Sequence, residues 1–206
     1  MTQEQTEAKI IKVAVELFLE KGKEGTKTWE IAEKAGINKA LLHYYFRSKD
    51  NLYKCVLEKE LSKFFMSLSN SFPEEENFEI YLKKLISLYV HNLAKNPQIT
   101  RFMIWEIGKK ESLIEKHLKK MFLQNENSPF MKVRTRIEDA QEKGLFRKIS
   151  PDHLIISIIG LCVFPFIGEK VIGILFPDLE IRSEDFIIKR SEEIFQLVWN
   201  GIRLEN

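Results

Sequence analysis

Residues Gly36–Tyr53 read GINKALLHYYFRSKDNLY, and the stretch places three adjacent rings, His43–Tyr45, among basic side chains. It opens with a glycine and an asparagine two residues later, which is typical of a turn followed by a helix N-cap. Leu42 and Phe46 are four residues apart and share one face of the predicted helix, while the ring-bearing residues fall on other faces. Because a helix can hide only one face, at least one ring must look outward.

A second short helix is predicted just before this one, over the sequence TWEIAEKAG from Thr28 to Gly36. Thr28 is expected to be its N-cap, and Gly36 the left-handed residue just past its end. Ala32 is small where two crossing helices must approach closely, and Ile37 supplies an apolar anchor. Two short helices separated by about three residues predict a helix-turn-helix, whose second helix enters a DNA major groove.

The polar residues of the second helix suit contact with DNA. Asn38 and Lys39 lie near the positive end of the helix dipole, beside phosphates or base edges. Lys39 can donate to a guanine or pair with a phosphate, and both alternatives stay open. His43 and Tyr44 can offer hydrogen bonds to phosphates, and Lys49 can contact the backbone as a point charge. The competing interpretation is an ordinary solvated basic face beside partly buried rings.

The rest of the chain is also predicted to be helical, so the fold class is all-α. No segment shows the period-two pattern and turn residues of a strand. Residues 1–50 are predicted to form a three-helix DNA-binding domain, and residues 51–206 a larger helical domain for ligand sensing and dimerisation. Helices are expected over residues 6–22, 28–36, 38–46, 48–70, 78–95, 99–107, 113–123, 128–144, 150–168 and 183–204.

The overall charge limits how such a protein could meet DNA. The chain has 206 residues, and its formal net charge is only +2, so any nucleic-acid contact must be local. The two cysteines, Cys55 and Cys162, lie far apart beside apolar residues, which argues against a disulfide framework and favours a reducing compartment. The polar N-terminus, MTQEQTEAK, does not read as a signal peptide. A cytoplasmic location is therefore expected.

One apolar segment, HLIISIIGLCVFPFIG over His153–Gly168, requires a test for membrane insertion. It is shorter than the ~20 residues that a bilayer requires. Pro165, Glu169 and Lys170 interrupt its continuation. A buried helix or a subunit interface is the preferred interpretation, and no membrane partner is expected.

The segment Ile11–Leu52 carries small, apolar and capping residues in a fixed order. With them it resembles the DNA-binding domain of the tetracycline-repressor (TetR) family, over the first quarter of the chain. The remaining three quarters resemble the family only in outline, as a variable helical domain whose last two helices form a dimer. The matching positions are Ala14, Leu17, Phe18, Gly22, Thr28, Ile31, Ala32, Ala35, Gly36, Ile37, Leu42, Tyr45, Phe46, Ser48, Lys49 and Leu52.

The resemblance implies specific DNA contacts. It implies phosphate contacts at Thr28, Tyr44 and Lys49. It implies groove contacts at four positions of the second helix, namely Lys39, Ala40, Leu41 and His43. Two of these depart from the common pattern, because Ala40 stands where glycine is frequent and His43 where tyrosine is frequent, so the base preference stays open.

For two aromatic residues of the helix-turn-helix, Trp29 and Tyr45, the sequence leaves two interpretations open. Trp29 follows the predicted cap, where some relatives use a DNA-contacting residue, and it could instead pack against the first helix. Tyr45 could contact DNA or support the contact face from beneath.

A helix-turn-helix monomer covers few base pairs, so a homodimer on a palindromic operator is expected. The helix from His153 is apolar nearly all round and needs more cover than one chain offers. Intramolecular core packing is the competing interpretation. The predicted interface residues are Ile155, Ile158, Ile159, Cys162, Ile194, Leu197 and Val198.

Aromatic residues gather between Phe64 and Phe130, and they could line a cavity for a hydrophobic small molecule or simply pack a core. The predicted ligand-binding residues are Tyr89, Phe102, Trp105 and Glu106. By the family's usual mode, such an effector would release a repressor from its operator. No cofactor is expected.

Catalysis is the competing class of function, and the spacings that it needs are missing from the sequence. There is no HExxH, no ExxH pair and no GxSxG elbow. The stretch GKEGTK follows a helix rather than a strand and lacks the spacing of a phosphate loop. His91, His117 and His153 are scattered, so no catalytic or metal-binding residue is predicted. A purely structural helical protein is the other alternative, and it leaves the basic, aromatic helix unexplained.

Overall fold

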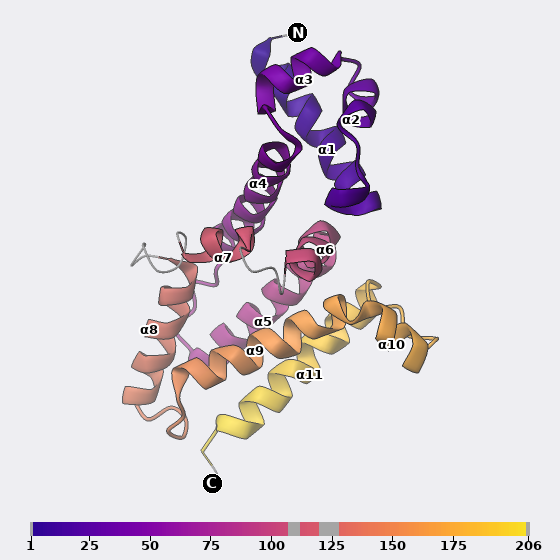
Figure 1. The fold of residues 1–206 in the computed structure, drawn as a ribbon. Coiled ribbons are helices and arrows are strands. Elements are labelled where there is room, and N and C mark those ends of the chain that lie inside the picture. Colours follow the sequence, from indigo (N-terminus) through magenta and orange to yellow (C-terminus); the bar gives the residue numbers. More distant parts are fainter. Residues whose placement is uncertain (1, 107–111, 120–127, 205–206) are drawn as a thin grey trace. The chain divides into compact units, whose positions relative to one another are not determined.

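The computed structural model describes residues 2–106, 112–119 and 128–204, and within these ranges it is helical with no strand (Figure 1). This confirms the all-α prediction. The ends of the helices predicted over 99–107 and 113–123 lie outside the described residues, as does Phe122, one of the aromatic residues between Phe64 and Phe130. The helices are α1 (Gln3–Gly25), α2 (Thr28–Lys34), α3 (Lys39–Phe46), α4 (Lys49–Asn70), α5 (Phe78–Lys95), α6 (Pro97–Glu106), α7 (Leu113–Leu118), α8 (Pro129–Glu142), α9 (Pro151–Ile167), α10 (Glu169–Leu175) and α11 (Glu184–Ile202).

The chain divides into two units. Unit 1 comprises Met1–Lys63 and Arg101–His117, and unit 2 comprises Phe64–Thr100 and Leu118–Asn206. This division differs from the boundary near residue 51 expected from the sequence. The first half of α4 belongs to unit 1 because its side chains are needed there: Tyr53 is buried and its ring meets that of Phe18 edge-on at 5.1 Å between centroids.

Helices α1, α2 and α3 pack through small and aliphatic side chains. Ala14 and Phe18 of α1 have no exposed surface, and neither has Ile31 of α2. Leu42 and Phe46 of α3 are also buried, which confirms the inward face predicted for this helix. These contacts fix the orientation of α3 and so determine which of its side chains reach solvent.

The turn between α2 and α3 depends on Gly36, whose φ is +66°. Its backbone N–H donates to the carbonyl oxygen of Glu33 at 2.9 Å, and that of Ile37 donates to Ala32 at 2.9 Å. This pair of bonds is the Schellman arrangement, in which a left-handed residue ends a helix. The predicted role of Gly36 is confirmed.

Replacing Gly36 with alanine is expected to lower the free energy of unfolding by about 1–2 kcal/mol, because a Cβ atom disfavours the left-handed conformation. Chemical denaturation followed by circular dichroism measures the change. Gly173→Ala is the matched control: this glycine lies within α10, and a Cβ atom there would meet nothing within 4 Å. Because alanine favours helices, the control should be neutral or slightly stabilising. Equal losses in both variants would contradict this assignment.

The N-terminal ends of two helices differ from the predictions. Helix α1 begins at Gln3 rather than near Thr6, because Thr2 and Gln5 form a reciprocal capping box. Helix α2 has Lys27, not Thr28, at its N-cap position, and the Glu30 carboxylate accepts the Lys27 backbone N–H at 3.2 Å. Thr28 is therefore the first helical residue, with its side chain half-buried.

Unit 2 is built on α5, α9 and α11, which pack against one another (Figure 1). Their facing side chains form a continuous apolar core. Arg182, just before α11, donates to both carboxylate oxygens of Glu169 at 2.9–3.3 Å and to the Ala94 carbonyl at 3.1 Å. This clamp joins the end of α5 to the start of α10. The core side chains include Leu82, Ile86, Val90, Leu154, Ile194 and Phe195.

Within the described part of the chain, no single helix is long and apolar enough to cross a bilayer. Helices α9 and α10 meet the length and composition test only together, and they are bent by 74° at the break between them.

Candidate nucleic-acid interface and ligand cavity

The N-terminal end of α3 is capped by Asn38 and exposed to solvent. The Asn38 side-chain oxygen accepts the backbone N–H of Leu41 at 2.7 Å, as the sequence predicted for a capping asparagine. Lys39 and Ala40 occupy the first turn and are exposed. The free N–H groups and the dipole of this turn favour an anion there.

A small concavity of about 80 Å³ lies beside this turn, and we call it the basic concavity. It brings together four of the predicted DNA contacts, which come from α2, α3 and the start of α4. Arg47 and Ser48 complete its polar lining. The polar lining residues are Thr28, Lys39, His43, Arg47, Ser48 and Lys49.

Lys49 is the most constrained cation of the basic concavity. Its ammonium group donates to the Thr26 carbonyl oxygen at 3.4 Å and lies 4.0 Å from a carboxylate oxygen of Glu24. The Ser48 hydroxyl oxygen accepts the Asn51 backbone N–H at 3.1 Å and so caps the start of α4. The start of α4 therefore presents Lys49 in a defined position.

The Tyr44 ring projects from α3 and is 59% exposed, more than an aromatic ring without a partner would normally be. Its neighbour Arg47 places the guanidinium carbon 5.8 Å from the ring centroid. Tyr45 is half-buried, meets Tyr44 edge-on at 5.7 Å, and donates a long hydrogen bond of 3.4 Å to the Gln3 carbonyl. This geometry favours the interpretation of Tyr45 as a support.

Arg47 is the residue of this surface that the sequence reasoning missed. It is exposed and has a φ of +62°, the only positive value for a residue other than glycine in the described chain. Its position between the last turn of α3 and the Ser48 cap was the available signal, because Arg47 is the C-cap residue at which the helix ends. That conformation directs an additional cation to the basic concavity.

All ten predicted DNA-contact residues are exposed or half-buried. Trp29 is 56% exposed, so its ring is not packed into the core around α1. Ala40 is exposed and Leu41 half-buried on the first turn of α3.

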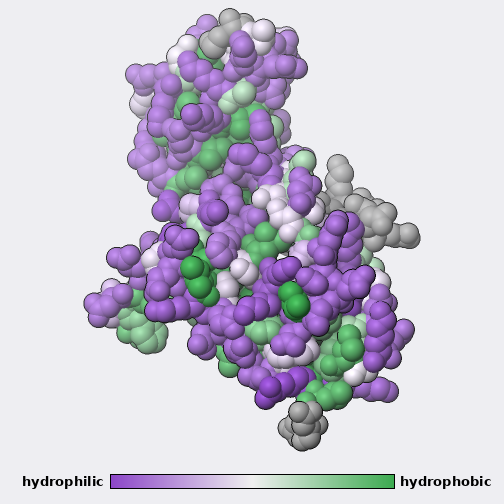
Figure 2. All heavy atoms as spheres, turned by 180° about the vertical axis from the view of Figure 1, so that it is seen from behind, coloured by the Kyte–Doolittle hydropathy of each residue, from purple (hydrophilic) through white to green (hydrophobic). Residues whose placement is uncertain are grey.

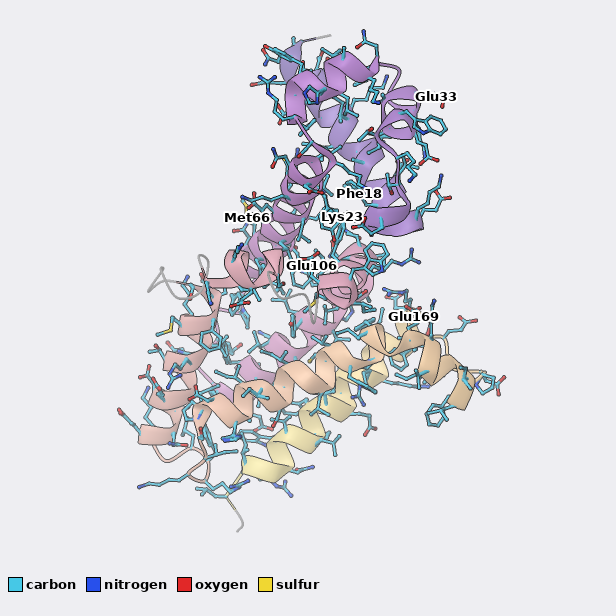
Figure 3. All side chains as sticks on the ribbon, viewed as in Figure 1. Phe18, Lys23, Glu33, Met66, Glu106 and Glu169 are labelled. Atoms are coloured by element: carbon cyan, nitrogen blue, oxygen red, sulfur yellow. The ribbon has the colours of Figure 1, made fainter. Side chains whose placement is uncertain are left out.

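The predicted ligand-binding residues are not brought together. Phe102, Trp105 and Glu106 belong to unit 1, where Phe102 has no exposed surface and Glu106 accepts the Tyr53 hydroxyl at 3.1 Å. Burial, and then the nearby Glu106 carboxylate, raise the pKa of Tyr53. Phe18, Lys23 and Glu106 surround Tyr53 and lie in one region of the unit (Figure 3). These residues form a packed core with a buried hydrogen bond.

Tyr89 lies in unit 2, where it lines a separate cavity of about 120 Å³, which we call the apolar cavity. The lining comes from α4, α5, α8 and α9 and the residues that flank them. It includes Phe65, Leu85, Tyr89, Phe130, Ile155 and Ile158.

The predicted dimer stripe requires a correction in register. Ile155, Ile158 and Cys162 of α9 are at most 5% exposed, and Ile194 and Val198 of α11 at most 7%, so these five side chains pack inside one chain. Of the predicted set, only Ile159 and Leu197 are exposed, at 41% and 61%. The sequence pattern identified the two helices but selected mainly their core-facing sides.

Other apolar side chains of the same helices face solvent. Ile156 and Phe164 are 65% and 62% exposed on α9, and small residues, Ser157 and Gly160, lie between them. On the side opposite to the view of Figure 1, hydrophobic patches also interrupt a mostly hydrophilic surface (Figure 2). The exposed face made of Ile156, Ser157, Gly160 and Phe164 on α9 and Leu197 on α11 is called the outer face.

The described residues contain no group of three or more His, Cys, Asp or Glu side chains that could hold a metal ion.

Comparison with known proteins agrees with this geometry. Residues 10–56 match the model for bacterial regulatory proteins of the tetR family, and residues 80–198 match the model for the tetracyclin repressor-like C-terminal domain. The first match covers the basic concavity, and the second covers most of the apolar cavity and the outer face.

Individual relatives are transcriptional regulators. The chain is 27% identical to the HTH-type transcriptional regulator RutR of Escherichia coli strain K12, over 94% of this chain and 89% of RutR. It is 31% identical to the HTH-type transcriptional repressor SCO4008 of Streptomyces coelicolor, over 50% of each chain. A solved structure of a HlyIIR mutant protein is 26% identical, covers 95% of this chain and 97% of its own, and has a TM-score of 0.61.

The two matched models together span most of the chain, and the relatives are regulators rather than enzymes. The chain belongs to the tetR family of bacterial regulatory proteins, which are DNA-binding transcriptional regulators.

Proposed function

We propose that this protein is a cytoplasmic repressor that binds a palindromic operator as a homodimer and is released by a small, largely hydrophobic effector. The observation that carries the proposal is the basic concavity beside the exposed end of α3. There, Lys39, Arg47 and Lys49 converge next to His43 and Thr28, although the formal net charge of the whole chain is only +2. Such a local concentration of cations suits the phosphates that flank a major groove.

The outer face supports the homodimer. An exposed apolar stripe with small residues at its centre lets a second helix approach closely. A second copy of the chain would cover this exposed stripe.

The apolar cavity supports the effector. It lies within unit 2, whereas the basic concavity lies in unit 1, so the two sites are separate, as regulation requires. Helix α4 carries Leu52 of the basic concavity and, further along, Phe65 and Leu68 of the apolar cavity. A continuous helix with residues in both sites is a direct route for coupling.

Selection of bound sequences from random DNA should return two inverted half-sites, because a two-fold dimer reads two copies of the same sequence. With three cations per subunit near phosphates, the log–log dependence of affinity on salt should have a slope of about −5. Fluorescence anisotropy on the selected operator measures this slope. A single direct half-site, or binding that does not depend on sequence, would reject the operator proposal.

A further inference from the structure

The apolar cavity has a lining that restricts the chemistry of its ligand. None of its described lining residues carries a charge. An ionised ligand would lose its hydration on entry and find no opposite charge among these side chains. The cavity therefore selects against carboxylates and ammonium groups.

Tyr89 supplies the only polar side-chain group of the described lining. Its hydroxyl makes no hydrogen bond to any described residue, and its ring lies against that of Phe64 at 6.4 Å between centroids. Burial, followed by the nearby Cys162 thiol, raises the pKa of Tyr89, so the hydroxyl keeps its proton at neutral pH. The protonated phenol can donate a hydrogen bond to an acceptor on a ligand.

The size of the cavity bounds the ligand. Its volume is about 120 Å³. A protein cavity of about 150 Å³ lined by Leu, Ile and Phe binds benzene, so this smaller volume admits one ring, and a ring with a substituent requires the lining side chains to move. The rings of Phe65, Phe72 and Phe130 form part of the lining and can pack edge-on or offset against an aromatic ligand.

We propose that the apolar cavity binds a neutral compound with a single aromatic ring and an oxygen atom that accepts the Tyr89 hydroxyl hydrogen bond. This inference rests on the proposed function, because it takes the cavity as the effector site. The phenyl group of the ligand fills the space between the aromatic side chains, and its carbonyl or ether oxygen accepts a hydrogen bond from the Tyr89 hydroxyl.

Three probes of similar size separate the contributions to binding. Acetophenone is neutral and has an acceptor, ethylbenzene is neutral and has none, and benzoate is charged. Isothermal titration calorimetry on the full-length protein without DNA should rank acetophenone about 3- to 10-fold above ethylbenzene, the effect of one buried hydrogen bond. Benzoate should bind at least about 100-fold more weakly than acetophenone, because its charge is left unpaired.

Tyr89→Phe removes the hydroxyl and keeps the ring. In this variant acetophenone should fall to the affinity of ethylbenzene, while the affinity for ethylbenzene stays unchanged. Tyr81→Phe is the matched control, since Tyr81 is a buried tyrosine of the same helix that does not line the cavity. Val133→Phe fills part of the cavity and should weaken both neutral probes.

The outcomes separate the ligand class from the regulatory role. Equal binding of all three probes, preference for benzoate, or an unchanged preference in Tyr89→Phe overturns the inference. Operator affinity is measured separately by anisotropy. If acetophenone binds with the expected selectivity but leaves operator affinity unchanged, the ligand class stands and the effector role in the proposed function fails.

Discussion

Replacing Lys39 and Tyr44 together by alanine is expected to weaken operator binding about 1000-fold at physiological salt, with the fold and the dimer retained. Lys39 lines the basic concavity at the exposed first turn of α3, and the Tyr44 ring stands in solvent one turn further along. Each contact to DNA contributes about 1–3 kcal/mol, and a dimer repeats both contacts in its second half-site. Because both side chains are exposed, their loss removes little packing.

Fluorescence anisotropy on the selected operator measures this loss, and circular dichroism checks the fold. Lys12→Ala removes the same charge from an exposed position on α1 and should leave operator affinity nearly unchanged. The single Lys39→Ala variant settles the alternative left open by the sequence. A phosphate contact predicts a salt dependence shallower by about 2 for the dimer, whereas a base contact predicts a relaxed sequence preference. Retention of operator affinity in the double variant would refute the assignment of this face to DNA.

Introducing glutamate at both Phe164 and Leu197 is expected to convert the protein from a dimer to a monomer at micromolar concentration. Both side chains are more than 60% exposed on the outer face. In a two-fold dimer the double variant buries four like charges and removes four apolar contacts, which should raise the dissociation constant more than about 1000-fold. Since operator binding needs two half-sites, operator affinity should fall with it.

Analytical ultracentrifugation reports the mass of each variant. Met66→Glu makes the same kind of change at an exposed position on α4, 62% accessible and away from the outer face, and should stay dimeric. A dimer that survives the double substitution would place the interface elsewhere. A wild-type protein that is monomeric at micromolar concentration would exclude the homodimer altogether.

Local rules predicted much of unit 1 from the sequence. The Asn38 cap, the left-handed Gly36 and the inward pair Leu42 and Phe46 each depend on residues within one turn of themselves. The N-cap of α2 is the exception, because it is Lys27 and not the predicted Thr28. The Glu30 carboxylate accepts the Lys27 backbone N–H, and the helix therefore begins one residue later than its cap, at Thr28.

Long-range packing was beyond those rules. Glu106 and Phe102 join unit 1 because the buried Tyr53, more than forty residues earlier, contacts both. Nothing in the local sequence around Phe102 indicates that partner. The register of α9 was similarly hidden, because a helix with apolar residues nearly all round gives no contrast between its core-facing and outer sides. Ile156 and Ile155 are adjacent and chemically identical, and only the packing distinguishes them.

Helix α9 contributes residues to two different surfaces, one on each side of the helix. Ile155 and Ile158 form part of the wall of the apolar cavity, while Ile156 and Phe164 lie on the outer face. A rigid helix cannot shift one side without the other, so in the proposed function ligand binding and self-association depend on the same element. By mass action, the apparent affinity for a ligand should therefore change with protein concentration across the dissociation constant of the dimer. A dose–response curve for this protein then has meaning only together with the protein concentration at which it was recorded.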